Sequence, residues 1–177
     1  MDERDPHQPP GGPPGDTDLF LPLPPAGAPR DNVTAEDQEV AKGYFDWEDK
    51  GPIHDGMRLT VMSRSTTYGV GDEVRVIHAL EVVAPGRAVY IMGPKPVVGT
   101  YLDDRLASPP PPDVEDPWIP LDYDGATTTS PAIDCNYEVS VFRFDEPGEH
   151  RIEWRLPPLR SNGISIRVTP SGGEPRP

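Results

Sequence analysis

The stretch that decides the fold is residues 137–156, which reads YEVSVFRF-DEPG-EHRIEWRL. Apolar and polar side chains alternate on both sides of DEPG, a period of two that is typical of β-strands with one buried face. DEPG is a turn signal, so the pattern predicts two strands joined by a turn. Trp154 shares its face with Ile152 and Leu156, which predicts a core residue. The other face of this second strand is a charged row suited to cross-strand pairs: Glu149, Arg151, Glu153 and Arg155.

Further strands are predicted on both sides of this stretch. Upstream, short apolar runs between glycine- and proline-rich turn signals predict strands at 57–63, 73–83, 88–92 and 97–102. In the second of these, the odd positions include charged residues, which predicts one buried face and one exposed face. Downstream, Ser161-Asn162-Gly163 predicts a turn before a last strand whose inward side chains are Ile164, Ile166 and Val168.

The proline-glycine turn, the strand with an inward tryptophan and the closing apolar strand resemble the end of an immunoglobulin-like or fibronectin-like sandwich. The resemblance is one of pattern and covers residues 57–169. It implies an all-β fold: a single immunoglobulin-like antiparallel sandwich of seven to eight strands within residues 57–170. The pattern matches no specific family, so no functional residues follow from it. The paired cysteines of antibody domains are absent, because Cys135 is the one cysteine.

Charge and proline are concentrated outside the predicted strands. The chain has 177 residues and a formal net charge of −14, and residues 1–50 and 103–124 carry the excess acids. The abundant prolines predict a disordered acidic tail at 1–33, because proline blocks both helix and sheet; residues 171–177 are also predicted to be disordered. Residues 103–124 are predicted to form an acidic, proline-rich loop. These stretches serve solubility or attract a basic partner, and they repel nucleic acid.

Two short apolar clusters interrupt the polar stretches. The first is an island in the tail, either a docking motif or loose cover for the domain: Leu19, Phe20, Leu21 and Leu23. The second lies in a linker, residues 34–56, in which Thr34 is a candidate N-cap for a short helix that Gly43 ends. An aromatic and acidic cluster follows this helix and either packs on the domain or binds a partner: Tyr44, Phe45 and Trp47.

No arrangement of side chains predicts catalysis or a bound cofactor. His78 and His150 fall on apolar faces of predicted strands. A metal site formed by them, with His54 or Cys135 as a further candidate ligand, is the alternative to separate core histidines. The segment Asp122-Tyr123-Asp124-Gly125 is similar to the start of a calcium loop, but no bidentate glutamate follows at the needed distance. Ser130 and Cys135 lack a nucleophile elbow. We therefore expect no enzyme activity, no cofactor and no metal.

The leading functional expectation is a non-enzymatic protein–protein interaction module. A ligand- or metal-binding β-sandwich and a loop-presenting protease inhibitor are the alternatives. The candidate partner-binding residues combine aromatic rings with acids: Tyr44, Phe45, Trp47, Asp113, Glu115, Asp116 and Trp118. In this hypothesis the acids guide a basic protein and the rings hold it. In the competing view the rings pack inward and the acids only aid solubility.

The expected location is the cytoplasm, with no membrane partner. The single Cys135 rules out an internal disulfide, which suits a reducing compartment. The first residues lack the apolar core of a signal peptide, and no apolar run approaches the length of a membrane span.

Overall fold

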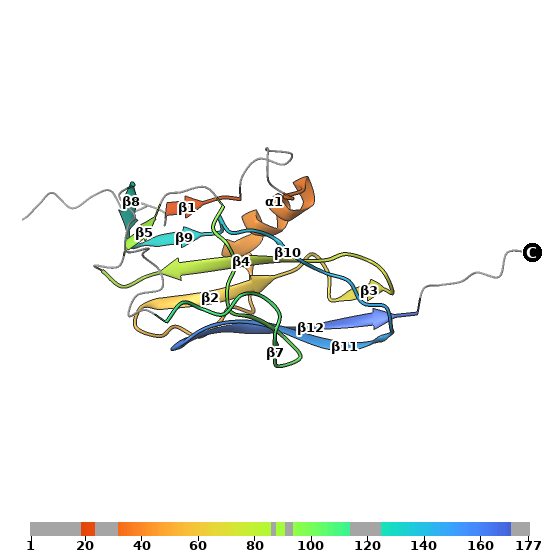
Figure 1. Ribbon diagram of the computed structural model, residues 1–177. Coiled ribbons are helices and arrows are strands. Elements are labelled where there is room, and N and C mark those ends of the chain that lie inside the picture. Colours follow the sequence, from red (N-terminus) through yellow and green to blue (C-terminus); the bar gives the residue numbers. More distant parts are fainter. Residues whose placement is uncertain (1–18, 24–31, 86–87, 91–93, 114–124, 171–177) are drawn as a thin grey trace, which may run out of the picture.

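The computed structural model describes residues 19–23, 32–85, 88–90, 94–113 and 125–170 (Figure 1). Within these residues it has twelve β-strands, one α-helix and one 3-10 helix, which confirms the all-β class. The predicted number of strands, seven to eight, is too low. Strands of two or three residues are too short to show alternation, and five of them were not predicted: β1 (Leu19–Leu21), β3 (Thr67–Gly69), β7 (Arg105–Leu106), β8 (Thr127–Thr129) and β9 (Ala132–Asp134).

The first sheet is built around the nine-residue strand β4 (Val74–Val82). β4 pairs antiparallel with β2 (Met57–Met62), with β9 and with β10 (Ser140–Phe142). β1 extends this sheet by pairing parallel with β9. A separate two-stranded pair is formed by β5 (Ala88–Tyr90) and β8.

The second sheet is built around the hairpin of β11 (Gly148–Leu156) and β12 (Leu159–Thr169). β3 pairs parallel with β12, while β6 (Thr100–Leu102) pairs with β11 and β7 pairs with β6. The DEPG segment therefore connects β10 in the first sheet to β11 in the second.

The turn of the β11–β12 hairpin lies at Pro157-Pro158, and the prediction of a turn at Ser161-Asn162-Gly163 is wrong. Asn162 lies inside β12, and its side-chain amide forms with the backbone of β2 the hydrogen bonds that a neighbouring strand would otherwise form. The backbone N–H of Val61 donates to Asn162 Oδ1 at 2.8 Å, and Asn162 Nδ2 donates to the Val61 carbonyl at 3.0 Å. This buried pair of hydrogen bonds joins the two sheets.

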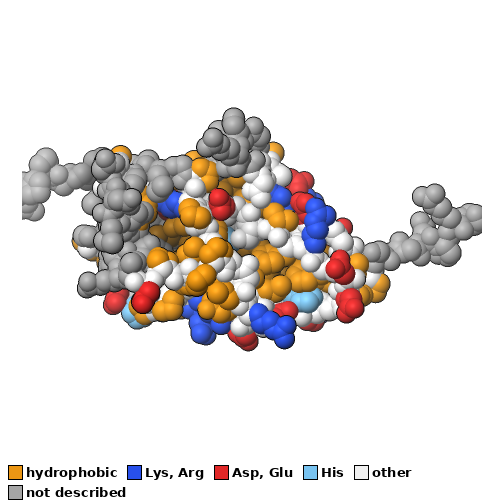
Figure 2. All heavy atoms as spheres, viewed as in Figure 1, with side chains coloured by type: hydrophobic (Ala, Val, Ile, Leu, Met, Phe, Trp, Pro, Cys, Tyr) orange, Lys and Arg blue, Asp and Glu red, His pale blue; other side chains and the backbone are white. Residues whose placement is uncertain are grey.

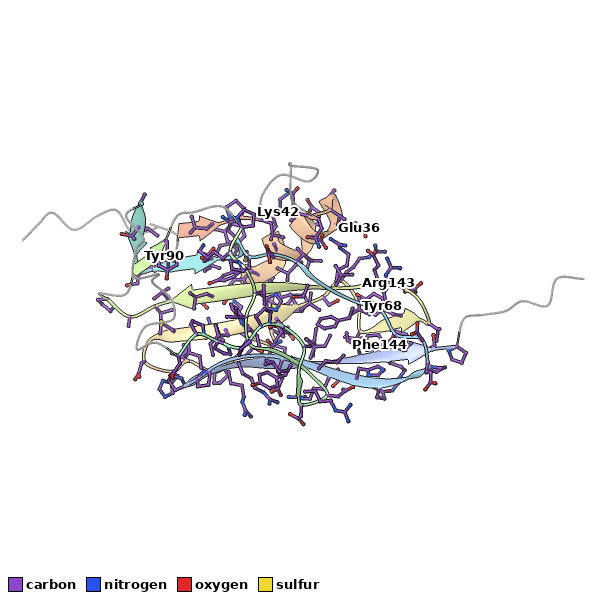
Figure 3. The ribbon with its side chains drawn as sticks, in the orientation of Figure 1. Glu36, Lys42, Tyr68, Tyr90, Arg143 and Phe144 are labelled. Carbon is purple, nitrogen blue, oxygen red and sulfur yellow. The ribbon has the colours of Figure 1, made fainter. Side chains whose placement is uncertain are left out.

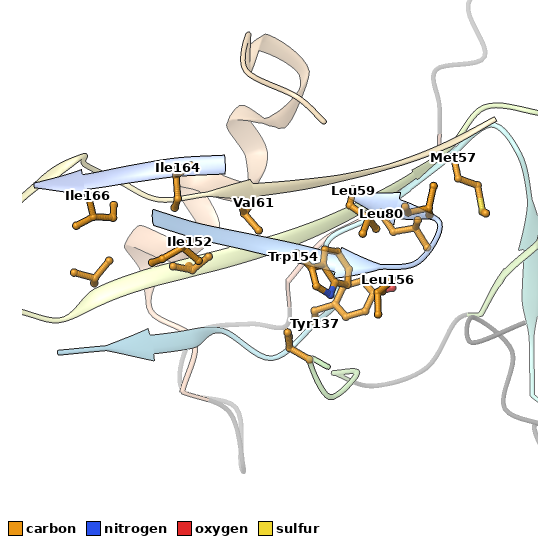
Figure 4. Packing of buried hydrophobic residues seen from close by; sticks show 14 of the residues in the cluster. Met57, Leu59, Val61, Leu80, Tyr137, Ile152, Trp154, Leu156, Ile164 and Ile166 are labelled. Atoms are coloured by element: carbon orange, nitrogen blue, oxygen red, sulfur yellow. The ribbon is translucent and has the colours of Figure 1, made fainter. Parts of the chain in front are cut away.

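The main core lies between the two sheets, and Figure 4 shows their apolar side chains meeting there. Trp154 is 1% exposed and Ile152 and Leu156 are buried with it, which confirms the predicted register of β11. Tyr137 and Val139 are also buried, but Val141 is exposed, because the chain becomes a regular strand only at Ser140.

A second core covers the other face of the first sheet, so the prediction of one exposed face for β4 is wrong. Ile77 and Ala79, at odd positions of β4, are fully buried beneath α1 (Ala35–Lys42) and the 3-10 helix η1 (Gly43–Asp46). Figure 1 shows α1 on the side of β4 that faces away from β11 and β12. The predicted helix start is confirmed: Thr34 Oγ1 accepts a hydrogen bond from the Asp37 N–H, the Asp37 carboxylate accepts one from the Thr34 N–H, and the helix is capped at Gly43.

Part of the predicted disordered tail is ordered. Residues 19–21 form β1 on the open edge of β9, and Leu23, two residues later, is buried in the second core. The apolar island is therefore cover for the domain, as one of its two interpretations held. The predicted disorder of residues 1–18, 24–31 and 171–177 lies outside the described residues.

The predicted acidic loop begins as a tight hairpin. β6 and β7 are joined by Asp103 and Asp104, which both have positive φ, 49° and 61°. Two successive residues with positive φ make a type I′ turn, in which aspartate is favoured. These two acids are turn residues with partners of their own. The predicted loop is described as far as Asp113, and its remainder, 114–124, lies outside the described residues.

Leu23 offers a test of this N-terminal cover. We expect Leu23→Ala to lower the free energy of unfolding by about 2–3 kcal/mol, because it removes a buried side chain and leaves a cavity. Urea unfolding followed by circular dichroism measures the change. Ile53→Ala, at an exposed leucine-sized position, is the matched control and should change stability by less than about 0.5 kcal/mol. Equal effects of the two variants would show that residues 19–23 do not pack on the sheet in solution.

Candidate functional site

The three rings of the aromatic cluster after α1 differ in burial: one is buried, one is exposed and one is half-buried. Tyr44 is fully buried, and its hydroxyl donates to Glu81 Oε2 at 2.7 Å. Burial, followed by the hydrogen bond to the Glu81 carboxylate, raises the pKa of Tyr44. Arg58 also bonds Glu81, and Lys50 Nζ lies 4.3 Å from the centre of the Tyr44 ring. Tyr44 is thus an anchor that fixes η1 on β4, and its ring is closed to a partner.

Phe45, the next residue, points to solvent. Its side chain is 50% exposed, and its ring centre lies 5.5 Å from that of Phe20, the half-buried middle residue of β1. The exposed acids Asp46 and Glu48 follow it in the chain. Trp47 is half-buried against the second core. The result is an aromatic pair, Phe20 and Phe45, with Asp46 and Glu48 next to it in the chain and Lys50 Nζ 3.4 Å from the Phe45 carbonyl; we call it the Phe45 patch.

Of the other four predicted partner-binding residues, one lies in the described part of the chain. Asp113 is described and exposed. Glu115, Asp116 and Trp118 lie outside the described residues, so the predicted composite surface of rings and acids stays a prediction.

A groove of about 400 Å³ lies between α1, β3 and the start of β4. Figure 3 shows Glu36, Tyr68 and Arg143 at this end of the molecule. Its charges are paired: Arg75 holds both carboxylate oxygens of Asp37 at 2.8–3.1 Å, and Arg64 bonds Glu36. Burial acts to raise the pKa of Asp37, but the bonds from Arg75 and Thr34 outweigh it and lower that pKa. The groove wall is therefore a set of ion pairs that ties α1 to β4.

The sequence analysis missed these pairs, although one signal was present. Arg75 is a charged residue inside an otherwise apolar strand, and such a residue needs a partner when the strand is covered on both faces.

The prediction of cross-strand pairs along the charged row of β11 is confirmed in part: Glu149 pairs with Arg167 of β12 at 2.6 Å. Figure 2 shows acidic and basic side chains next to each other along the β11–β12 edge.

The two candidate metal-binding histidines have separate surroundings. His78 is buried, its Nε2 lies 3.2 Å from Thr100 Oγ1, and its ring meets that of Trp154 edge to face. His150 is half-buried, its Nδ1 lies 2.8 Å from Asp103 Oδ2, and its ring stacks on Phe144 at 3.9 Å. Within the part of the chain that the structure describes, no group of three or more potential metal ligands is present.

A buried ion pair near β5 is the most unusual polar feature of the domain. Lys95 Nζ lies 2.6 Å from Asp134 Oδ2, and the two residues are 5% and 0% exposed. Burial raises the pKa of Asp134, although Lys95 opposes this. The neighbouring Cys135 is also buried, and burial raises the pKa of its thiol. Sequence reasoning missed this pair because no motif or spacing connects positions 39 residues apart.

Comparisons with protein-family models, curated proteins and solved structures each gave no match to this chain. Among the described residues, no helix has both the length and the hydropathy that crossing a membrane requires. Three features of the described residues remain as candidates for a function: the Phe45 patch, the groove with its ion pairs, and the buried Lys95–Asp134 pair.

Proposed function

We propose that this chain is a non-enzymatic protein–protein interaction module that binds a basic protein through the Phe45 patch. The observation that carries the proposal is the contrast between two neighbouring rings, one fully buried and one half-exposed. A half-exposed phenylalanine keeps apolar area in water, and covering it with a partner stabilises the complex. Aromatic anchors are also what protein interfaces concentrate at their centres.

The contacts that hold the backbone under the Phe45 patch support this proposal. η1 is held by the buried Tyr44–Glu81 hydrogen bond, and α1 is held by the Arg75–Asp37 pair. A ring mounted on such a fixed turn loses little conformational freedom when it is bound. The neighbouring acids, Asp46 and Glu48, would attract a basic partner. This attraction would weaken as the salt concentration is raised.

The proposal includes the scaffold and the location. Two facing sheets, a closing hairpin with a buried tryptophan and short connecting loops support an immunoglobulin-like sandwich, a scaffold that binds through its loops and edge strands. The cytoplasm is supported by Cys135, a buried thiol with no disulfide.

The test compares variants of the full chain used as bait in a lysate of the native organism. We expect Phe45→Ala to weaken binding of the captured partner about 30-fold, the effect of losing roughly 2 kcal/mol at an interface anchor. Its own stability should change by less than about 1 kcal/mol, because the ring is half-exposed. The matched control is Val141→Ala, another exposed apolar residue, 37% exposed, on β10.

The affinities are then measured with the purified partner at low and high salt. A partner held equally by wild type, Phe45→Ala and Val141→Ala would contradict the proposal. Binding that is independent of salt would contradict the role given to the acids.

A further inference from the structure

Lys95 and Asp134 are in direct contact inside the domain. Their Nζ to Oδ2 distance of 2.6 Å is that of an ion pair, and it holds the amine nitrogen beside the carboxyl group with which it could condense. The backbone holds both ends: the Lys95 N–H donates to the Asn136 carbonyl at 3.0 Å, and the Glu138 N–H donates to the Lys95 carbonyl at 2.8 Å. Asp134 Oδ1 accepts from the Asn136 N–H at 2.9 Å, which fixes the plane of the carboxyl group.

The surroundings of the pair are buried and aromatic. Both side chains are buried, and the rings of Tyr137 and Tyr90 lie with their centres 5.3 and 5.9 Å from Lys95 Nζ. Burial raises the pKa of Asp134, which favours its carboxylic acid form, the form from which water is lost on condensation.

We propose that Lys95 and Asp134 condense to an intramolecular isopeptide bond. The ammonium first passes a proton to Oδ2 along the existing contact, which gives a neutral amine and a carboxylic acid. The Nζ lone pair then attacks Cγ and forms the Nζ–Cγ bond. The Cγ–Oδ2 bond breaks, and Oδ2 leaves as water with the transferred proton and one further proton from Nζ. One amide and one water result, with no oxidation or reduction.

This bond would close the chain between residues 95 and 134. The closed segment contains the β6–β7 hairpin and the whole predicted acidic, proline-rich loop, 103–124. A covalent link at its base would fix both ends of that loop on the sheet and restrict the unfolded chain, as a disulfide does. The inference does not depend on the Phe45 patch, so either proposal can fail alone.

The test is the mass of the intact wild-type chain, measured after purification and again after prolonged warming below the melting temperature. We expect a mass about 18 Da below that of the sequence, the loss of one water. Digestion should give a branched peptide in which fragment ions join Lys95 to Asp134. Lys95→Arg keeps the positive charge but offers no condensing amine, so this variant should show the full mass. In denaturing gels the wild type should run faster than this variant.

One other reaction loses the same mass, and it must be separated. Asp55-Gly56 and Asp124-Gly125 can form succinimides, which reopen in mild alkali, whereas an amide does not. A deficit that persists in alkali and maps to Lys95 and Asp134 supports the proposal. A full mass in both samples, or a deficit that alkali removes, overturns it and leaves a buried ion pair.

Discussion

Trp154→Ala is expected to lower the free energy of unfolding by about 3–5 kcal/mol, a large part of the stability of a domain this size. The indole is 1% exposed and packs edge to face on His78 and Tyr137, with ring centres 5.0 and 5.1 Å away. Its Nε1 donates to the Val98 carbonyl at 2.8 Å. Truncation therefore opens a cavity and removes the partner of a carbonyl that holds β6 near β11.

Urea unfolding followed by circular dichroism measures this cost, with Trp154→Phe as the control. Phenylalanine fills most of the cavity but cannot donate to Val98, so its loss combines the missing hydrogen bond with a smaller cavity and should be less than that of Trp154→Ala. A cost well below 1 kcal/mol for Trp154→Ala would contradict the register of β11.

The register of β11 could be predicted because the information is local. Trp154 lies on a strand whose two faces differ strongly in polarity, and only one of them can be buried. The cap at Thr34 was predicted for the same reason, since its partner Asp37 lies three residues away. Both features need no knowledge of the rest of the fold.

The second face of β4 could not be predicted from its own residues. Arg75 and Glu81 mark this face as exposed, yet each is neutralised by a distant partner, Asp37 and Arg58 respectively. Burial of Ile77 between them depends on where α1 and η1 return to the sheet. The alternation of polar and apolar residues in β4 therefore identified the polar face correctly. It did not show that this face is covered by another part of the chain.

The candidate binding residues show the same limit. Tyr44 and Phe45 are neighbours of similar chemistry, and nothing in the sequence separates them. The 3-10 turn directs Tyr44 into the second core and Phe45 to solvent. The sequence predicted the cluster, and only the fold separates the anchor from the exposed ring.

The strongest pH effect is expected from His78. This side chain is fully buried, and desolvation lowers its pKa from 6.5 to about 3. In the folded state His78 is therefore neutral across mildly acidic pH, whereas in the unfolded state it takes up a proton below its ordinary pKa. Between these two values the unfolded state binds one more proton, so stability falls as the pH is lowered.

We expect this single group to remove roughly 1.5 kcal/mol of stability between pH 6.5 and pH 5, because the number of protons taken up on unfolding rises from about one half to nearly one over that interval. The measurement is the urea midpoint and slope at several pH values from 7.5 to 5. Carboxylates with lowered pKa, such as Asp37, contribute further losses at lower pH. The chosen range keeps these contributions small.

His78→Gln is the matched control, because glutamine is similar in size, can still bond Thr100 and does not titrate. Its stability should be nearly independent of pH over the same interval, so the difference between the two curves is the contribution of His78. Parallel curves for wild type and His78→Gln would mean that the imidazole takes up its proton in the folded state. That result would require water or an acidic group beside the ring, and the packing of His78 against Trp154 would then be wrong.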